Sequence, residues 1–169
     1  LLNSGEGGTA RFTPDMRNIE ATTGYRDARP AYPLVNLCAT EQNGNRTMVT
    51  VELGRPDKGG AAVLKDMHVS RGKLYCRYEG EDYEIAFTRP GLTEAAIRFE
   101  TLEDAEYTMT WGTHNGEFSY LHLIDNLTGN DVDLLVNQSY SFDAKTTDYA
   151  SRFKLVFATG SSVYGDSFG

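Results

Sequence analysis

The sequence predicts an all-β fold: an antiparallel β-sandwich, jelly-roll-like, with about 11 short strands and little helix. Apolar and polar residues alternate along many short segments, as side chains do along half-buried strands. Turn-forming residues recur between these segments at spacings of roughly 8 to 12 residues. Because each segment has one polar face, we favour a sandwich, in which a single core serves two sheets.

The first predicted unit is a hairpin. Pro30 and Pro33 extend the chain into a strand at 34–39. The dipeptide Asn43-Gly44 suits a tight turn that needs positive φ angles. The return strand, 47–53, places its valines and leucine on one face and leaves the other face polar.

The middle of the chain predicts a second hairpin. Residues 61–69 suit either a short strand or one helical turn, and we favour a strand or an irregular segment. The strands 73–78 and 82–87 flank a turn at 79–81, and Leu74, Cys76 and Tyr78 share one face.

The remaining strands follow in quick succession. They are expected at 95–100, 107–111, 120–124, 132–136, 139–144 and 152–157. Tyr107, Met109 and Trp111 alternate with threonines, which indicates one wall of the core. The segments on either side of 125–131 should pair as antiparallel neighbours, because that loop is rich in Asx and glycine.

The domain organisation follows from local composition. Residues 1–24 suggest a linker or partly ordered arm, 25–158 the β-sandwich domain, and 159–169 a C-terminal linker. Arg89-Pro90-Gly91 marks a possible internal break near 89–92. The chain starts without an initiator methionine or a signal segment, so we expect a processed chain or a fragment. Cys38 and Cys76 are interpreted as free core thiols, or alternatively as one disulfide between strands.

Composition argues against two classes of partner. With 16 Lys and Arg against 24 Asp and Glu, the formal net charge is -8, which disfavours nucleic acid and anionic membrane surfaces. No apolar run approaches the roughly 20 residues that span a bilayer, so no membrane insertion is expected. We expect a monomer that contacts a glycan or neighbouring domains of its own polypeptide.

Several strings resemble a segment found near the C-termini of large secreted and surface proteins of Bacteroidetes. They are 107–111, 115–129, 140–142 and 147–157, with weaker likeness at 51–60 and 78–83. The resemblance covers about 34–157 and implies a secreted or cell-surface location on the exterior of the outer membrane. In such proteins the segment often precedes a sorting-type domain used in type IX secretion. The motif positions are aromatic, aliphatic and turn residues, so the resemblance implies no catalytic or binding residue.

The loop after residue 124 carries oxygen ligands that calcium prefers. Asp125, Asn130 and Asp131 form the candidate calcium site, and no other cofactor is expected. The alternative is a hairpin loop whose Asx side chains bond to their own backbone, since the spacing does not match an EF-hand.

Aromatic residues offer a candidate sugar platform. Trp111 and Tyr120 could stack on a sugar ring while His114 bonds to its hydroxyls, as in a carbohydrate-binding or adhesin module. The alternative places Trp111 in the core with Tyr107 and Met109.

No catalytic constellation is visible, so the chain is not expected to be an enzyme. Neither a nucleophile elbow nor a metal-binding histidine pair occurs. Arg152 alternates with Phe153 and Leu155, so it should face away from their layer and form a structural ion pair with Asp125 or Asp143. The favoured function is a non-catalytic structural or spacer module of a secreted or cell-surface bacterial protein.

Overall fold

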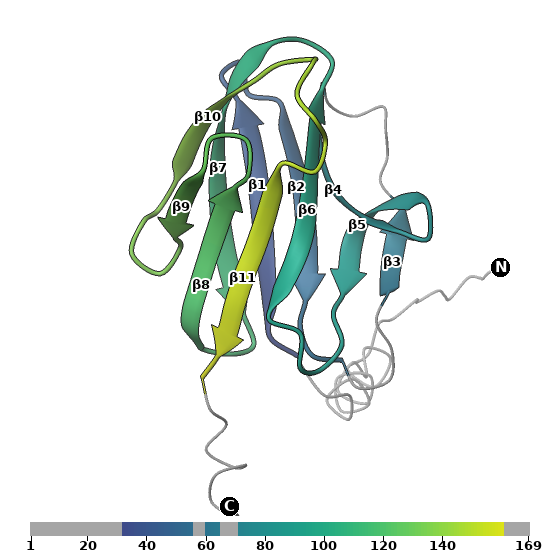
Figure 1. Cartoon of the computed structure of the whole chain (residues 1–169), viewed down its shortest axis with the longest axis vertical. Coiled ribbons are helices and arrows are strands. Elements are labelled where there is room, and N and C mark those ends of the chain that lie inside the picture. The colour runs from purple at the N-terminus through teal and green to yellow at the C-terminus, as the bar shows by residue number, and fades with distance from the viewer. Residues whose placement is uncertain (1–31, 56–59, 65–70, 161–169) are drawn as a thin grey trace, which may run out of the picture. The chain divides into compact units, whose positions relative to one another are not determined.

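The computed structural model describes residues 32–55, 60–64 and 71–160, which belong to one compact unit beginning at Tyr32. These residues form strands and turns without a helix, so the all-β prediction is confirmed (Figure 1). The predicted arm at 1–24 and most of the C-terminal linker lie outside the described residues. The strands are β1 (Leu34–Glu41), β2 (Arg46–Glu52), β3 (Gly60–Leu64), β4 (Gly72–Tyr78), β5 (Glu81–Phe87), β6 (Glu94–Thr101), β7 (Ala105–His114), β8 (Phe118–Asp125), β9 (Asn130–Asp133), β10 (Tyr140–Ala144) and β11 (Phe153–Thr159).

Hydrogen bonds join the strands into one continuous sheet rather than the two separate sheets of a sandwich. The strand order is β10-β7-β1-β2-β5-β4-β6-β11-β8-β9, and β3 pairs with β5 outside this path. The sheet folds over on itself, so that β6, β11 and β8 lie in front of β7, β1 and β2 (Figure 1). Most neighbours are antiparallel as predicted, but β2 and β5 are parallel, and the long connection through β3 and β4 supplies the crossover that a parallel pair needs. The break expected near 89–92 is the connection between β5 and β6 within this unit.

The core lies between the two layers of the folded sheet. Its members alternate along β1, β2, β7, β8 and β11, as the period of two requires. Tyr107 and Met109 are buried on β7, which confirms that this strand forms a wall of the core. Phe99 lies at the centre of an aromatic cluster, with ring centroids 4.9 Å from Tyr107 and 5.3 Å from Phe142.

Both predicted hairpins form, with residues of positive φ in their turns. Gly44 has a φ of 98° between β1 and β2, and Glu79 and Gly80 have φ of 50° and 89° between β4 and β5. Two successive positive φ angles match the hairpin turn that favours glycine at its second position. Leu74, Cys76 and Tyr78 alternate along β4 as predicted, but Tyr78 is 37% exposed, because it lies at the end of β4, where β4 no longer pairs with β6.

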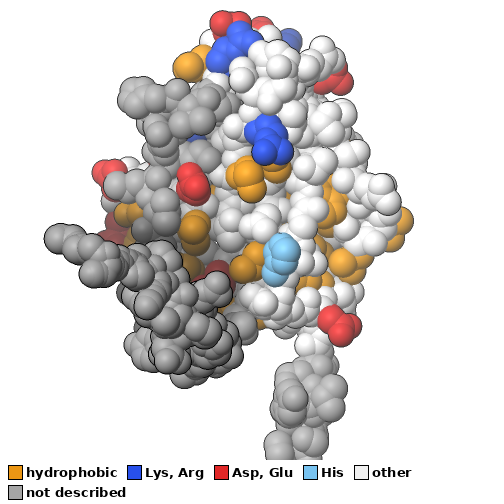
Figure 2. Space-filling model, turned by 180° about the vertical axis from the view of Figure 1, so that it is seen from behind, with side chains coloured by type: hydrophobic (Ala, Val, Ile, Leu, Met, Phe, Trp, Pro, Cys, Tyr) orange, Lys and Arg blue, Asp and Glu red, His pale blue; other side chains and the backbone are white. Residues whose placement is uncertain are grey.

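The outer face of β7, β1 and β2 is polar but largely uncharged. The strand register places Thr40 beside Thr108 and Cys38 beside Thr110. Thr50 donates a hydrogen bond of 2.6 Å to Asn36 across β2 and β1. On the visible part of this face, white atoms of the backbone and of uncharged polar side chains surround patches of hydrophobic side chains, with few charged side chains (Figure 2). Both cysteines are free thiols, with Cys76 buried and Cys38 half-buried on this face.

Candidate functional site

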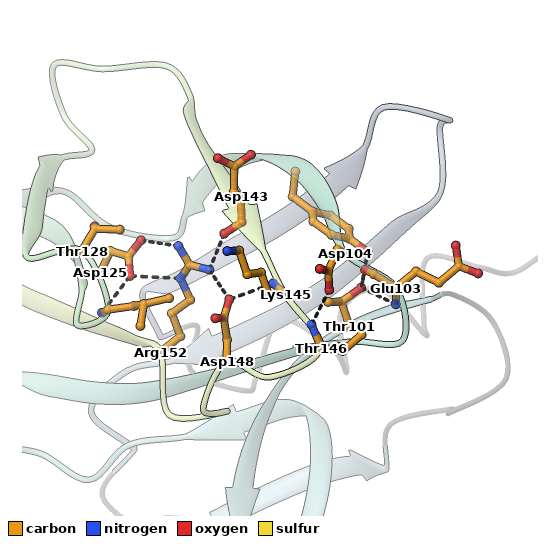
Figure 3. A network of polar contacts seen from close by, with 12 residues as sticks. Thr101, Glu103, Asp104, Asp125, Thr128, Asp143, Lys145, Thr146, Asp148 and Arg152 are labelled. Carbon is orange, nitrogen blue, oxygen red and sulfur yellow. Dashed lines mark hydrogen bonds and ion pairs between the residues drawn. The ribbon is translucent and has the colours of Figure 1, made fainter.

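A buried polar cluster surrounds Arg152, where β8, β10 and the start of β11 meet (Figure 3). Arg152 immediately precedes β11, Asp125 is the last residue of β8, and Asp143 lies on β10. Asp148 lies in the turn between β10 and β11. We call these four residues the arginine cluster.

The guanidinium of Arg152 binds Asp125 through two parallel hydrogen bonds. Nε donates to Oδ1 at 3.0 Å and Nη2 donates to Oδ2 at 2.9 Å. Nη1 donates to the backbone carbonyl of Asp143 at 2.7 Å and to Oδ2 of Asp148 at 3.3 Å. The predicted ion pair with Asp125 is therefore confirmed, while Asp143 contributes its carbonyl rather than its carboxylate.

Arg152 is 1% exposed and does not face away from the core layer, contrary to the sequence expectation. Its guanidinium carbon lies 4.7 Å from the centroid of the Phe142 ring and 5.3 Å from that of Phe153. Alternation fails here because Arg152 precedes the strand rather than lying within it. The planar cation can thus pack on aromatic faces while its edge satisfies the carboxylate.

Asp125 is fully buried and receives further hydrogen bonds besides those from Arg152. The Tyr140 hydroxyl donates to Oδ2 at 2.8 Å, and the backbone N–H of Leu127 donates to Oδ1 at 3.0 Å. Burial alone would raise the pKa of Asp125, but the bonds from Arg152 and Tyr140 outweigh it and lower that pKa. The carboxylate is therefore held ionised and saturated, which suits it poorly to carry a proton at neutral pH.

Local sequence explains how the cluster is positioned. Asp125 opens a turn in which the N–H of Gly129 donates to the Asp125 carbonyl at 2.7 Å, and Gly129 has a φ of 81°. Asp148 fixes a second turn by accepting the N–H of Lys145 at 2.8 Å. Asx side chains stabilise such turns by bonding to nearby backbone groups. The two turns bring both acids to Arg152.

A surface hollow of about 380 Å³ adjoins the arginine cluster. Thr128, Asn130, Tyr140 and Lys145 are among its lining residues, and Arg152 forms part of its wall. Asn130 Nδ2 donates to the Tyr140 hydroxyl at 3.0 Å. The Tyr140 hydroxyl thus lies within hydrogen-bonding distance of both Asn130 and Thr128 in this hollow.

The calcium candidates Asp125, Asn130 and Asp131 do not act together in the structure. Asp125 is bound to Arg152, Asn130 to Tyr140, and Oδ1 of Asp131 lies 2.5 Å from Nδ1 of His122. In the part of the chain that the structure describes, no group of three or more His, Cys, Asp or Glu side chains could hold a metal ion. The alternative of self-bonded Asx turns describes Asp125 well.

The three residues of the predicted aromatic platform occupy different surroundings. Trp111 packs against the core, and its Nε1 donates to the Leu134 carbonyl at 2.9 Å. His114 is exposed at the end of β7. Tyr120 is 42% exposed on β8 and stacks on His122, with ring centroids 4.0 Å apart and an interplanar angle of 5°.

Sequence reasoning did not find Tyr140, Asp148 or His122 as members of polar contacts. Asp148 could have been found, since it lies four residues before Arg152 in a turn-forming stretch. Tyr140 and His122 had no such signal, because their partners are brought near only by strand pairing and by the Asp125 turn.

Comparison with known proteins finds no matching family model, no matching curated protein and no matching solved structure. The resemblance to Bacteroidetes surface proteins therefore stays an expectation. Among the described residues, no helix is long and apolar enough to cross a membrane.

Proposed function

We propose that this chain is a non-catalytic structural module of a secreted or cell-surface bacterial protein. The observation that carries the proposal is the saturation of the arginine cluster. Arg152 and Asp125 are hydrogen-bonded to each other. Arg152 also donates to Asp143 and Asp148, and Asp125 also accepts from Tyr140. A group bound in this way connects the ends of strands and leaves little capacity for a substrate.

Aromatic burial supports the same proposal. Tyr107, Phe142 and Phe153 are each at most 5% exposed and pack against Phe99 in the core. Aromatic side chains buried in this way stabilise the module and are not accessible to a sugar ring. Rigid packing is what a spacer between domains requires.

A second candidate function is glycan binding, and one observation favours it. The Tyr120 ring is partly exposed and is braced by the parallel His122 ring, with the Asp131 carboxylate beside them. An exposed aromatic ring next to hydrogen-bonding groups is a common platform for a sugar. The glycan platform would then consist of Tyr120, which the sequence predicted, and His122 in place of Trp111.

Retention of the whole chain during affinity electrophoresis in gels that contain soluble polysaccharides separates the two functions. The structural proposal predicts the same mobility in gels with and without polysaccharide. Retention that Tyr120→Ala abolishes would overturn it in favour of glycan binding. Tyr149→Ala is the matched control, because Tyr149 is similarly exposed at 49% and lies away from His122 in sequence.

A further inference from the structure

Strand β6 changes its pairing partner halfway along its length. Its second half, Arg98–Thr101, pairs with β4, whereas its first half, Glu94–Ile97, pairs with β11 alone. No described strand lies on the other side of this first half. The reason is that β4 leaves β6 after Tyr75 and pairs with β5 from Cys76 onward. We call the opening between β4 and the first half of β6 the seam.

The register identifies which backbone groups face the seam. Phe157 N–H donates to the Thr93 carbonyl at 2.8 Å, so Thr93 is bonded toward β11. Ladder hydrogen bonds alternate along an antiparallel strand, so Ala95 and Ile97 also bond toward β11. Glu94 and Ala96 therefore direct their N–H and C=O groups into the seam. An open edge of this kind is a template for another strand.

The seam opens into a groove of about 490 Å³. Its apolar lining includes Val51, Cys76, Ala86 and Ala95. Large apolar side chains also reach solvent at its rim, since Leu92 is 52% and Tyr78 is 37% exposed. Clustered exposed apolar side chains beside an open strand edge indicate a surface that a partner covers.

The charged side chains at the groove indicate which residues a partner should carry. Arg77 and Arg89 both line the groove. Arg77 is already paired with Asp82 at 2.7 Å, whereas Arg89 is exposed and forms no ion pair with any described residue. An acidic group on the partner would therefore complement Arg89.

We propose that the seam binds an extended peptide segment of another protein or domain, which adds a strand beside β6. The backbone of the segment pairs with Glu94 and Ala96, its inward side chains are aliphatic, and an acidic residue pairs with Arg89. Main-chain bonds and alternating side chains are the ordinary basis of such strand addition. The proposal is independent of the structural role inferred above, because it rests on a different part of the sheet.

The test is residue-resolved hydrogen exchange by NMR on the whole chain, with the probe peptide acetyl-Thr-Val-Thr-Val-Thr-Glu-amide at about 1 mM, which populates complexes of weak affinity. We expect the amides of Glu94 and Ala96 to exchange faster than those of Ala95 and Ile97 before the peptide is added. Peptide titration gives the Kd, and at a peptide concentration of ten times that Kd exchange at Glu94 and Ala96 should slow by roughly tenfold. No change at these two amides would overturn the proposal.

Two control peptides test the hydrogen-bonding requirement without altering the protein. One is N-methylated at both valines and the other at all three threonines, so each blocks the donors along one edge of the added strand. At least one of them should fail to protect Glu94 and Ala96. If both protect as well as the parent peptide, the groove binds side chains without adding a strand, and the proposal is wrong.

The variant Arg89→Ala tests the acidic contact. It should weaken binding of the parent peptide several-fold and leave the pattern of protected amides unchanged. Replacing the terminal glutamate of the peptide by glutamine should weaken binding to the unaltered chain equally. Unchanged affinity in both experiments would refute the assignment of an acidic residue to Arg89.

Discussion

Replacing Arg152 by leucine should destabilise this chain more than any exposed charge substitution. The variant removes every hydrogen bond to Asp125 from the guanidinium, while Asp125 remains fully buried. Leaving one partner of a buried ion pair uncompensated costs about 3 to 5 kcal/mol. At about 2 to 4 °C per kcal/mol for a chain of this size, the melting temperature should fall by roughly 6 to 20 °C.

Urea unfolding monitored by the fluorescence of Trp111 measures this loss. Trp111 is the single tryptophan, and its indole packs against the core, so its emission should report unfolding. Lys154→Met, two residues further along the chain, is the matched control, since the Lys154 ammonium lies 3.8 Å from Glu94 and its side chain is 39% exposed. Such a surface pair contributes about 0 to 1 kcal/mol.

The double variant Asp125→Leu with Arg152→Leu separates the loss of the pair from the exposure of an unpaired charge. Replacing a whole buried ion pair by apolar residues often costs little. The double variant should therefore be more stable than Arg152→Leu alone, despite losing the bond from Tyr140. If Arg152→Leu costs less than about 1 kcal/mol, or if the two single losses simply add, the structural role of the pair is refuted.

Three further outcomes follow from the same structure. The pKa of Asp125 is lower in the folded chain than its unfolded value of about 3.9. Its contribution to stability is therefore present above that pH and is lost as the pH falls through the folded pKa. The free energy of unfolding should accordingly fall with decreasing acid pH in the parent chain, and this dependence should be absent from Asp125→Leu. Gly72→Ala should lower the free energy of unfolding in urea by about 1 to 3 kcal/mol, because its new Cβ would lie 2.8 Å from the buried Tyr107 ring. A free energy of unfolding equal to that of the parent chain would contradict this packing. Burial raises the pKa of the Cys76 thiol to about 12, so a thiol reagent at pH 8 should label Cys76 only after the chain unfolds. Equal labelling rates for Cys76 and the half-buried Cys38 in the folded chain would contradict this burial.

Local signals predicted the strands well because each strand here carries its own alternation and its own turn. The hairpin at Gly44 and the wall formed by Tyr107 and Met109 depend on residues close in sequence. The parallel pairing of β2 with β5 has no local signal, since it depends on the path of the long connection between these two strands. The continuity of the sheet across β4 could not be predicted either. It arises because β4 changes its pairing partner halfway along its length, which depends on residues distant in sequence.

The candidate site was predictable only in part. An ion pair of Arg152 with Asp125 or Asp143 was predicted, and the structure pairs Arg152 with Asp125. The burial of Arg152 on Phe142 did not follow, because the period of two was extended one residue beyond the start of β11. The packing of Trp111 against the core was predicted by its alternation with Tyr107 and Met109, whereas the hydrogen bond from its indole N–H to the Leu134 carbonyl, 23 residues away, had no local signal.

The arginine cluster is tested most directly by 15N NMR of the Arg152 guanidinium in the whole chain. A buried guanidinium with its donors bonded to Asp125, Asp143 and Asp148 should show a slowly exchanging Nε–H and separate signals for Nη1 and Nη2. These signals should not move when soluble polysaccharides or inorganic phosphate are added. A rapidly exchanging Nε–H, or signals that shift on adding either compound, would contradict the structural role assigned to Arg152.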